Sequence, residues 1–441
     1  MKRDIDQPLN RWVKQPSRVP LLLRGARQIG KTFTVRQLAK TCFKNLVEIN
    51  FELEPFYAEC FQSLQPQTII NLIMSLSRQN IIAGETLLFL DEIQECPNAI
   101  MALRYFKELM PELHVIGAGS LLEFVLNEAD FRMPVGRVQY MYMHPLSFRE
   151  YLQAMGYERL LEQLRATCLN APPEKIIHEK LLSLVREYLF TGGMPDAIKT
   201  YIDTQDFPSV QYKQTILLNT YRNDFGKYAK HINYKYLQKV FDKTPQLLGQ
   251  QVKYSKIDET MRSRELKEAI ACLNKAGVIR SLYSSSASGL PLHALINEKK
   301  FKLLFLDIGL LIRATQVSAH QLFNEDLNLI HQGGISEQFV GQELLSYQDC
   351  LLEPELHYWS RDVVGSQAEL DYVVTQNSQI IPIEVKAGKT GTLKSLHQFM
   401  SEKNSRLGIR ISESPLTWRQ NILSVPFYLI GELSRLIGDS N

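Results

Sequence analysis

The stretch VPLLLRGARQIGKTFTVRQLAK, residues 19–40, decides the fold of this 441-residue chain. Its apolar run, Val19 to Leu23, has the length and composition of a buried parallel strand. The run leads into G-x-x-x-x-G-K-T, residues 25–32, and then into a segment with helical periodicity. A phosphate-binding loop requires this strand-loop-helix context. The stretch therefore predicts an α/β fold with a P-loop type parallel sheet.

Each part of the loop has a physical role. Gly25 and Gly30 let the backbone curl, so that its N–H groups point at phosphate oxygens near the positive end of the helix dipole. Lys31 is expected to reach the β- and γ-phosphates, and Thr32 to offer its hydroxyl to Mg²⁺. ATP and Mg²⁺ are therefore the expected cofactors. The candidate nucleotide-binding residues are Gly25, Ala26, Arg27, Gln28, Ile29, Gly30, Lys31, Thr32 and Phe33.

A second motif, ETLLFLDEIQECP at residues 85–97, places Asp91 and Glu92 directly after the apolar run Leu87 to Leu90. Ligands of open α/β sheets bind at the carboxyl ends of such strands. Asp91 is expected to hold Mg²⁺ through water, and Glu92 to polarise the attacking water. Together with the loop, the motif predicts Glu92 and Lys31 as catalytic residues.

Two further residues carry open alternatives. Ser120 ends the strand-like run LHVIGAGS, where it would touch the γ-phosphate or the attacking water, or else form the N-cap of the next helix. Arg137 follows the flexible Gly136, and it is either a charge sensor or arginine finger, or an ordinary exposed arginine. Ser120 and Arg137 complete the set of candidate nucleotide-binding residues.

Composition limits the other classes of function. The chain is 45% hydrophobic and 22% charged, with a net charge of only +3, so nothing global demands nucleic acid or an anionic membrane. Its six cysteines lie far apart without C-x-x-C or Cys/His clusters, which argues against a disulfide framework and structural zinc. No stretch approaches the roughly 20 apolar residues of a membrane span. We expect a cytoplasmic protein without a membrane partner.

A second candidate site lies in ELDYVVTQNSQIIPIEVKAG, residues 369–388. Glu384 and Lys386 share one face of a strand because side chains alternate. In one interpretation Asp371 and Glu384 bind Mg²⁺ with the Val385 carbonyl, while Lys386 orients or deprotonates the attacking water. Glu337 or Glu343, from the preceding predicted helix, would supply a further ligand.

The other interpretation is a hairpin whose opposite charges pair on its polar face. The run IIPIE, residues 380–384, is apolar enough for a central strand, where two converging carboxylates are costly without a cation. Both interpretations stay open at this point.

The motifs GARQIGKT, LLFLDEIQ, VIGAGS, GRVQYMYMHPLSFREYL and TGGMPDAI together resemble a known family. This family is the bacterial and archaeal AAA-type ATP-binding proteins with a C-terminal domain of largely unknown function. The resemblance covers nearly the whole chain and implies a P-loop sheet in which the third motif's strand lies between those of the first two. It also implies a small helical lid over the nucleotide. The helix and strand order of the last part resembles the restriction-endonuclease-like nuclease fold.

We therefore predict four domains. They are a P-loop AAA-type ATPase core (1–150), a helical lid (151–230), a winged-helix-like connector (231–316) and a restriction-endonuclease-like C-terminal domain (317–441). Basic and acidic residues nearly balance around the connector's predicted recognition helix, which favours a scaffold over a DNA reader.

The predicted function is ATP binding with Mg²⁺-dependent hydrolysis. Coupling to DNA, to a partner protein or to a second copy of the chain stays open. Two alternatives are an ATP-gated DNA endonuclease and a nucleotide-dependent interaction switch with negligible turnover.

Overall fold

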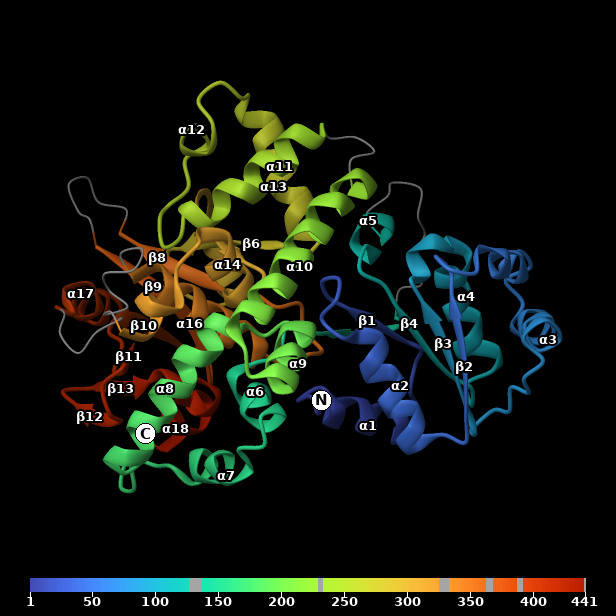
Figure 1. Cartoon of the computed structure of the whole chain (residues 1–441), viewed down its shortest axis with the longest axis horizontal. Helices are drawn as coiled ribbons and strands as arrows, with labels where there is room; N and C mark the ends of the chain where they lie inside the picture. Colours follow the sequence, from blue (N-terminus) through green and yellow to red (C-terminus); the bar gives the residue numbers. More distant parts are fainter. Residues whose placement is uncertain (127–135, 229–232, 325–332, 362–367, 387–391, 440–441) are drawn as a thin grey trace.

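A five-stranded parallel sheet forms the N-terminal part of the computed structural model, which describes residues 1–126, 136–228, 233–324, 333–361, 368–386 and 392–439 (Figure 1). Its strand order is β2-β3-β4-β1-β5. The elements of this part are α1 (Asp6–Lys14), β1 (Leu21–Arg24), α2 (Lys31–Cys42), β2 (Asn45–Asn50), η1 (Pro55–Phe61), α3 (Pro66–Ser77), β3 (Thr86–Asp91), η2 (Ile93–Glu95), α4 (Pro97–Leu109), β4 (His114–Ala118), α5 (Leu122–Leu126) and β5 (Gln139–Tyr142).

The central strands of this sheet are buried along their whole length, as parallel strands covered by helices on both faces must be. The predicted strand Leu87 to Leu90 lies within β3, and the predicted strand Val19 to Leu23 is shifted by one or two residues from β1. Strand β4 lies between β3 and β1, as the family resemblance implied. The predicted α/β fold with a P-loop type sheet is confirmed.

Helices follow the first sheet, and Figure 1 shows them between the two sheets. They are α6 (Phe148–Ala154), α7 (Glu158–Ala166), α8 (Lys175–Thr191), α9 (Pro195–Thr204) and α10 (Phe207–Tyr228). A break at TGGMP, residues 191–195, separates two of these helices, because α8 ends at Thr191 and α9 begins at Pro195.

Close approach of two backbones explains the glycines at this break. Gly192 has φ +76°, and a Cβ there would lie 2.3 Å from Oδ1 of Asp307. The Gly193 N–H donates to Oδ2 of the same carboxylate at 2.6 Å. The break therefore docks the helical region onto the segment that begins α14.

The second sheet has eight strands in the order β12-β13-β11-β10-β9-β8-β6-β7. The elements that build this half are α11 (Tyr234–Lys243), η3 (Thr244–Gln246), α12 (Tyr254–Ile257), α13 (Ser263–Lys275), β6 (Ile279–Ser285), η4 (Leu292–Leu295), β7 (Ile296–Phe305), α14 (Ile308–Thr315), α15 (Ala319–Asn324), α16 (Gly334–Ser346), β8 (His357–Ser360), β9 (Glu369–Gln376), β10 (Gln379–Lys386), α17 (Lys394–Lys403), β11 (Gly408–Ser412), β12 (Thr417–Arg419), β13 (Ile422–Pro426), η6 (Phe427–Glu432) and α18 (Leu433–Asp439).

One sheet thus spans the connector and the C-terminal part. The hairpin β6-β7 belongs to the predicted connector, yet β6 pairs in parallel with β8. The order of three helices and a hairpin is the one predicted for a winged helix, and that assignment stays a prediction, as do the domain boundaries. Strand β10 lies between β9 and β11, as the apolar run IIPIE predicted.

Among the described residues, none of the helices combines the length and the apolar composition that crossing a bilayer would require.

Candidate functional site

The glycine-rich loop lies between β1 and α2, at the carboxyl edge of the first sheet. Gly25 has φ +143°, Gln28 has φ +62° and Gly30 has φ +97°. At Gly25 a Cβ would lie 2.3 Å from the Met143 carbonyl oxygen, so a larger residue does not fit. The first N–H groups of α2 have no intrahelical acceptor, as at every helix N-terminus. They remain available to an anion at the start of α2.

Lys31 lies under this loop and is almost fully buried. Its Nζ donates to the carbonyl oxygens of Gly25 at 2.9 Å and Ala26 at 2.8 Å. Burial lowers the pKa of the ammonium to about 8, although Glu92 and Asp91 nearby raise it. The lysine thus folds back onto the loop, and a polyphosphate would offer it a stronger, charged acceptor.

Thr32 and Asp91 form the pair of oxygen ligands that the two motifs predicted. The Thr32 hydroxyl donates to Oδ2 of Asp91 at 2.9 Å, and the Asn50 amide donates to the same oxygen at 3.3 Å. Burial raises the pKa of Asp91, while the bond from Thr32 lowers it. Two hard oxygen donors in contact match the preference of Mg²⁺.

Glu92 is the first residue after β3, and its φ of +48° is a left-handed conformation. Its Oε2 accepts from the Gln94 amide at 2.8 Å and from the Ser120 hydroxyl at 3.5 Å. Ser120 therefore contacts the candidate catalytic carboxylate. The Glu92 carboxylate lies near enough to Lys31 and Arg27 of the loop for its charge to raise the pKa of both.

Helix α10 covers the tip of the loop. Arg27 Nη1 donates to Oδ1 of Asp224 at 2.5 Å, and the Tyr221 hydroxyl donates to the Arg27 carbonyl at 2.6 Å. Lys227 pairs with Glu52 at 2.5 Å, and Glu52 also lies 3.3 Å from Arg27. The candidate residue Arg27 is thus engaged in ion pairs with its neighbours, and the helical region reaches the nucleotide site through it.

Arg137 does not join this site within the chain. It lies before β5, at the amino edge of the sheet, and its Nε donates to Glu108 of α4 at 3.1 Å. The loop follows β1 at the opposite, carboxyl edge. The prediction of Arg137 as a nucleotide-binding residue is therefore not met in one copy of the chain.

The candidate residue Phe33 lies in the first turn of α2. Its side chain is 48% exposed, whereas that of Lys31 in the same turn is buried.

The C-terminal acidic cluster, which we define as Glu337, Glu369, Asp371 and Glu384, is organised around a buried lysine. Lys302 of β7 lies 2.7 Å from Glu369, 3.3 Å from Glu337 and 3.9 Å from Asp371. Burial alone would lower the pKa of Lys302, but the three carboxylates raise it above its ordinary value. The ammonium therefore stays charged, but one ammonium does not offset four carboxylates: burial and the nearby Asp371 raise the pKa of Glu337 to about 8 and that of Glu384 to about 7.

Asp371, Glu384 and Lys386 lie close together, as both interpretations required. Oδ2 of Asp371 accepts from the Val385 N–H at 2.7 Å, and Lys386 Nζ lies 2.5 Å from Oε1 of Glu384. Oε2 of Glu384 is buried and accepts no hydrogen bond from the described residues. In the same described part, no group of three or more His, Cys, Asp or Glu side chains is arranged to hold a metal ion. The pairing of Glu384 with Lys386 agrees with the hairpin interpretation.

Glu343 corrects the predicted ligand set, because it lies away from the cluster. Both of its carboxylate oxygens accept from the Phe148 N–H, at 3.0 and 3.1 Å, and one accepts from the Tyr347 hydroxyl at 2.8 Å. Helix α16 turns it toward α6, whereas Glu337 on the same helix faces Lys302. Glu337 is thus the residue of α16 that belongs to the cluster.

Sequence reasoning missed Lys302 and Asp224. The signal for Lys302 was a lysine inside the apolar run FKLLF, residues 301–305, where a charged side chain must be buried and paired. Asp224 had no comparable signal, since an acidic residue on a long helix is usually solvated.

Three family models match consecutive parts of the chain. A parallel sheet with a glycine-rich loop between β1 and α2 already defines a P-loop nucleotide-binding fold. An AAA domain matches residues 17–152, a domain of unknown function (DUF8612) matches residues 182–321, and a second one (DUF4143) matches residues 332–428. The chain thus combines an AAA domain with a C-terminal domain of unknown function.

Solved structures of low identity were also found. The Walker-type ATPase PABY2304 of Pyrococcus abyssi is 14% identical, with 71% of this chain and 96% of that chain covered and a TM-score of 0.46. The ORC1 protein of Aeropyrum pernix in complex with DNA is 14% identical, covers 72% and 93%, and has a TM-score of 0.29. AMPPCP-bound DnaA from Aquifex aeolicus is 11% identical, covers 61% and 85%, and has a TM-score of 0.28. Because these TM-scores are low, the fold assignment rests on the topology above. A comparison with curated proteins finds no match.

Proposed function

We propose that this chain binds ATP with Mg²⁺ at the loop of residues 25–32 and hydrolyses it. The observation that carries the proposal is the 2.9 Å contact between the Thr32 hydroxyl and Asp91, directly after the loop and at the end of β3. Thr32 and Asp91 would hold the ion, which supplies positive charge that offsets the charge developing on the phosphates. Lys31 would move from its loop carbonyls to the β- and γ-phosphate oxygens.

Glu92 is the proposed group that orients and polarises the attacking water. Gln94 and Ser120 bind one of its oxygens, which leaves the other oxygen to accept from water. The test is Glu92→Gln, which keeps the size of the side chain but loses its charge. We expect unchanged ATP affinity and turnover reduced by roughly 10²-fold or more. Turnover at the wild-type rate in this variant would remove Glu92 from the proposed role.

A nucleotide-dependent interaction switch with negligible turnover is the second candidate. It is favoured by the placement of Arg137, which pairs with Glu108 away from the loop, and by the pairing of Arg27 with Asp224. Hydrolysis that depends on an arginine would then need a second copy of the chain. Turnover per chain measured across a concentration series separates the two candidates. Turnover that rises with concentration indicates hydrolysis completed by a second copy, and negligible turnover at every concentration indicates the switch.

Coupling to DNA has less support. On α13, Arg264 pairs with Glu268 at 3.2 Å and Arg262 with Glu265 at 3.8 Å, so these charges are already balanced. We expect ATP turnover to change little when duplex DNA is added.

The ATP-gated endonuclease is also less favoured, because the buried Lys302 already pairs with carboxylates of the acidic cluster. A plasmid-nicking assay with Mg²⁺ and ATP tests it directly.

A further inference from the structure

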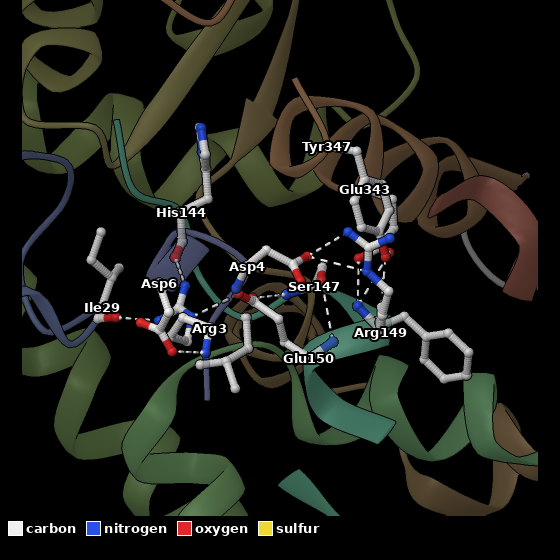
Figure 2. Close-up of polar contacts among 12 residues, drawn as sticks. Arg3, Asp4, Asp6, Ile29, His144, Ser147, Arg149, Glu150, Glu343 and Tyr347 are labelled. Atoms are coloured by element: carbon white, nitrogen blue, oxygen red, sulfur yellow. Dashed lines mark hydrogen bonds and ion pairs between the residues drawn. The ribbon is translucent and has the colours of Figure 1, made fainter. Parts of the chain in front are cut away.

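Arg3 lies against the phosphate loop although no motif marks it. Figure 2 shows its guanidinium between Ile29 and Glu150. Nη1 donates to the Ile29 carbonyl at 2.9 Å, Nη2 to the His144 carbonyl at 2.5 Å and Nε to Oε1 of Glu150 at 3.0 Å. The Arg3 side chain is only 6% exposed. Arg3, near the start of the chain, thus contacts the loop, the residues that follow β5 and helix α6 together.

The Ile29 carbonyl needs such a partner because of the loop's backbone shape. Ile29 is flanked by Gln28 and Gly30, both with positive φ. In a loop of this kind the N–H groups converge on the anion while carbonyls turn outward. A buried carbonyl without a donor is destabilising, so the bond from Arg3 stabilises this conformation over others.

Glu150 holds Arg3 in place. Besides Arg3, its carboxylate accepts from the Ser147 N–H at 2.9 Å and the Asp4 N–H at 2.6 Å. Ser147 accepts in turn from the Glu150 N–H, which completes a capping box at the start of α6. The position of the guanidinium is therefore set by the end of a helix and not by the loop it supports.

Only an arginine can make these three contacts together. Its planar guanidinium presents donors in several fixed directions, whereas a lysine offers one nitrogen. Nη1 of Arg3 also lies close behind Gly30, since a Cβ built there would be in ordinary van der Waals contact with it at 3.7 Å. The arginine thus fills the space behind the loop as well as satisfying its carbonyl.

We propose that Arg3 is a positioning residue for ATP binding, which keeps the phosphate loop in the shape that receives the phosphates. This inference rests on the proposed function. Arg3 contacts the loop through the Ile29 carbonyl and not through an N–H group that would bind phosphate, and its other partners are His144 and Glu150. Loss of Arg3 therefore weakens ATP binding through the loop conformation.

The test compares Arg3→Lys with Arg149→Lys in the full chain. Arg149 belongs to the same polar network in Figure 2, where it donates to Asp4 at 2.8 Å and lies 5.0 Å from the centre of the Tyr347 ring. Within the described residues it forms no contact with the loop, so it controls for general loss of stability. The dissociation constant of Mg-ATP and the melting temperature are measured for both variants.

We expect Arg3→Lys to raise the dissociation constant of Mg-ATP about tenfold, and Arg149→Lys to change it less than about twofold. Arg3→Ala should raise it further than Arg3→Lys. Equal dissociation constants for the two lysine variants would overturn the inference, even if both variants have a lower melting temperature than the wild type. A wild-type chain that binds no Mg-ATP would overturn the proposed function and the inference with it.

Discussion

The Nζ of Lys302 on β7 lies 2.7 Å from Oε1 of Glu369 on β9. Glu337 and Asp371 lie at 3.3 and 3.9 Å from the same nitrogen. In the metal-site interpretation Asp371 and Glu384 would hold the ion; in the structure Lys302 of the connector hairpin lies 3.9 Å from Asp371, and Glu384 pairs with Lys386. This ion-pair cluster joins the connector to the C-terminal strands.

Removal of the Lys302 charge should destabilise the chain. Lys302→Met leaves buried carboxylates without a counter-ion, and breaking a buried pair in this way costs about 3–5 kcal/mol. Lys299→Met, an exposed position on the same strand, should cost less than about 0.5 kcal/mol. Thermal and denaturant unfolding of both variants measure the difference.

Divalent cations should distinguish wild type from this variant. We expect millimolar Mn²⁺ to change the melting temperature of the wild type little, because Lys302 already pairs with Glu369 and Glu337, and Lys386 with Glu384. In Lys302→Met the freed carboxylates should bind the ion and recover part of the lost stability. A rise in the wild type that Asp371→Ala abolishes would instead restore the metal-site interpretation.

The buried carboxyl of Glu343 should make stability depend on pH. Burial, above all, raises its pKa to about 8. The folded chain then keeps a proton that the unfolded chain releases near pH 4.5, so this contribution is complete below that pH and is lost as pH rises toward 8.

The measurement is the melting temperature between pH 5 and 8, which should fall as pH rises in the wild type. Its dependence on pH should be weaker in Glu343→Gln, which mimics the protonated form. Glu259→Gln, an exposed control, should keep the wild-type slope. Identical slopes in all three chains would show that Glu343 does not titrate in this range.

Lys31 should make ATP binding depend on pH. Burial lowers its pKa to about 8, so the empty site loses the ammonium above that pH, and binding must then take up a proton. We expect the dissociation constant of ATP to be constant below pH 7 and to rise above pH 8. Lys31→Ala should weaken binding by about 1–3 kcal/mol at neutral pH and remove this dependence. Titrations at several pH values check both statements.

Gly192 should be far less tolerant of a side chain than another glycine of similar φ. Gly192→Ala adds strain of about 1–3 kcal/mol, because φ +76° with ψ −176° is essentially restricted to glycine. It also adds a clash with Asp307, for which overpacking costs about 1–3 kcal/mol more. Gly156, at φ +80°, has open space around it, so Gly156→Ala should show backbone strain without a clash. A comparison of their melting temperatures isolates the contact between the TGGMP break and the start of α14. Equal losses would mean that the contact adds nothing.

The elements that carry the candidate nucleotide site could be predicted from sequence because its parts are local. The residues of the loop, 25–32, are consecutive, and Asp91 and Glu92 follow a strand whose apolar composition places its end at the binding edge. The prediction fails for residues whose role depends on which distant segments meet. Arg137 sits two residues before its strand, and only the direction of that strand, parallel to β1, places it at the far edge.

Tertiary structure alone decided the partners of charged groups. Alternation along β10 already placed Glu384 and Lys386 on one face, but the pairing of the cluster with Lys302 required the connector hairpin to join the second sheet. Periodicity likewise assigned Glu337 and Glu343 to one helix without saying which of them faces the cluster. The sequence by itself determined the elements and the phosphate loop, because short-range sterics and hydrophobic patterns act over a few residues. The neighbours of each buried charge were decided by the assembled fold, because ion pairs join segments that nothing in the local pattern relates.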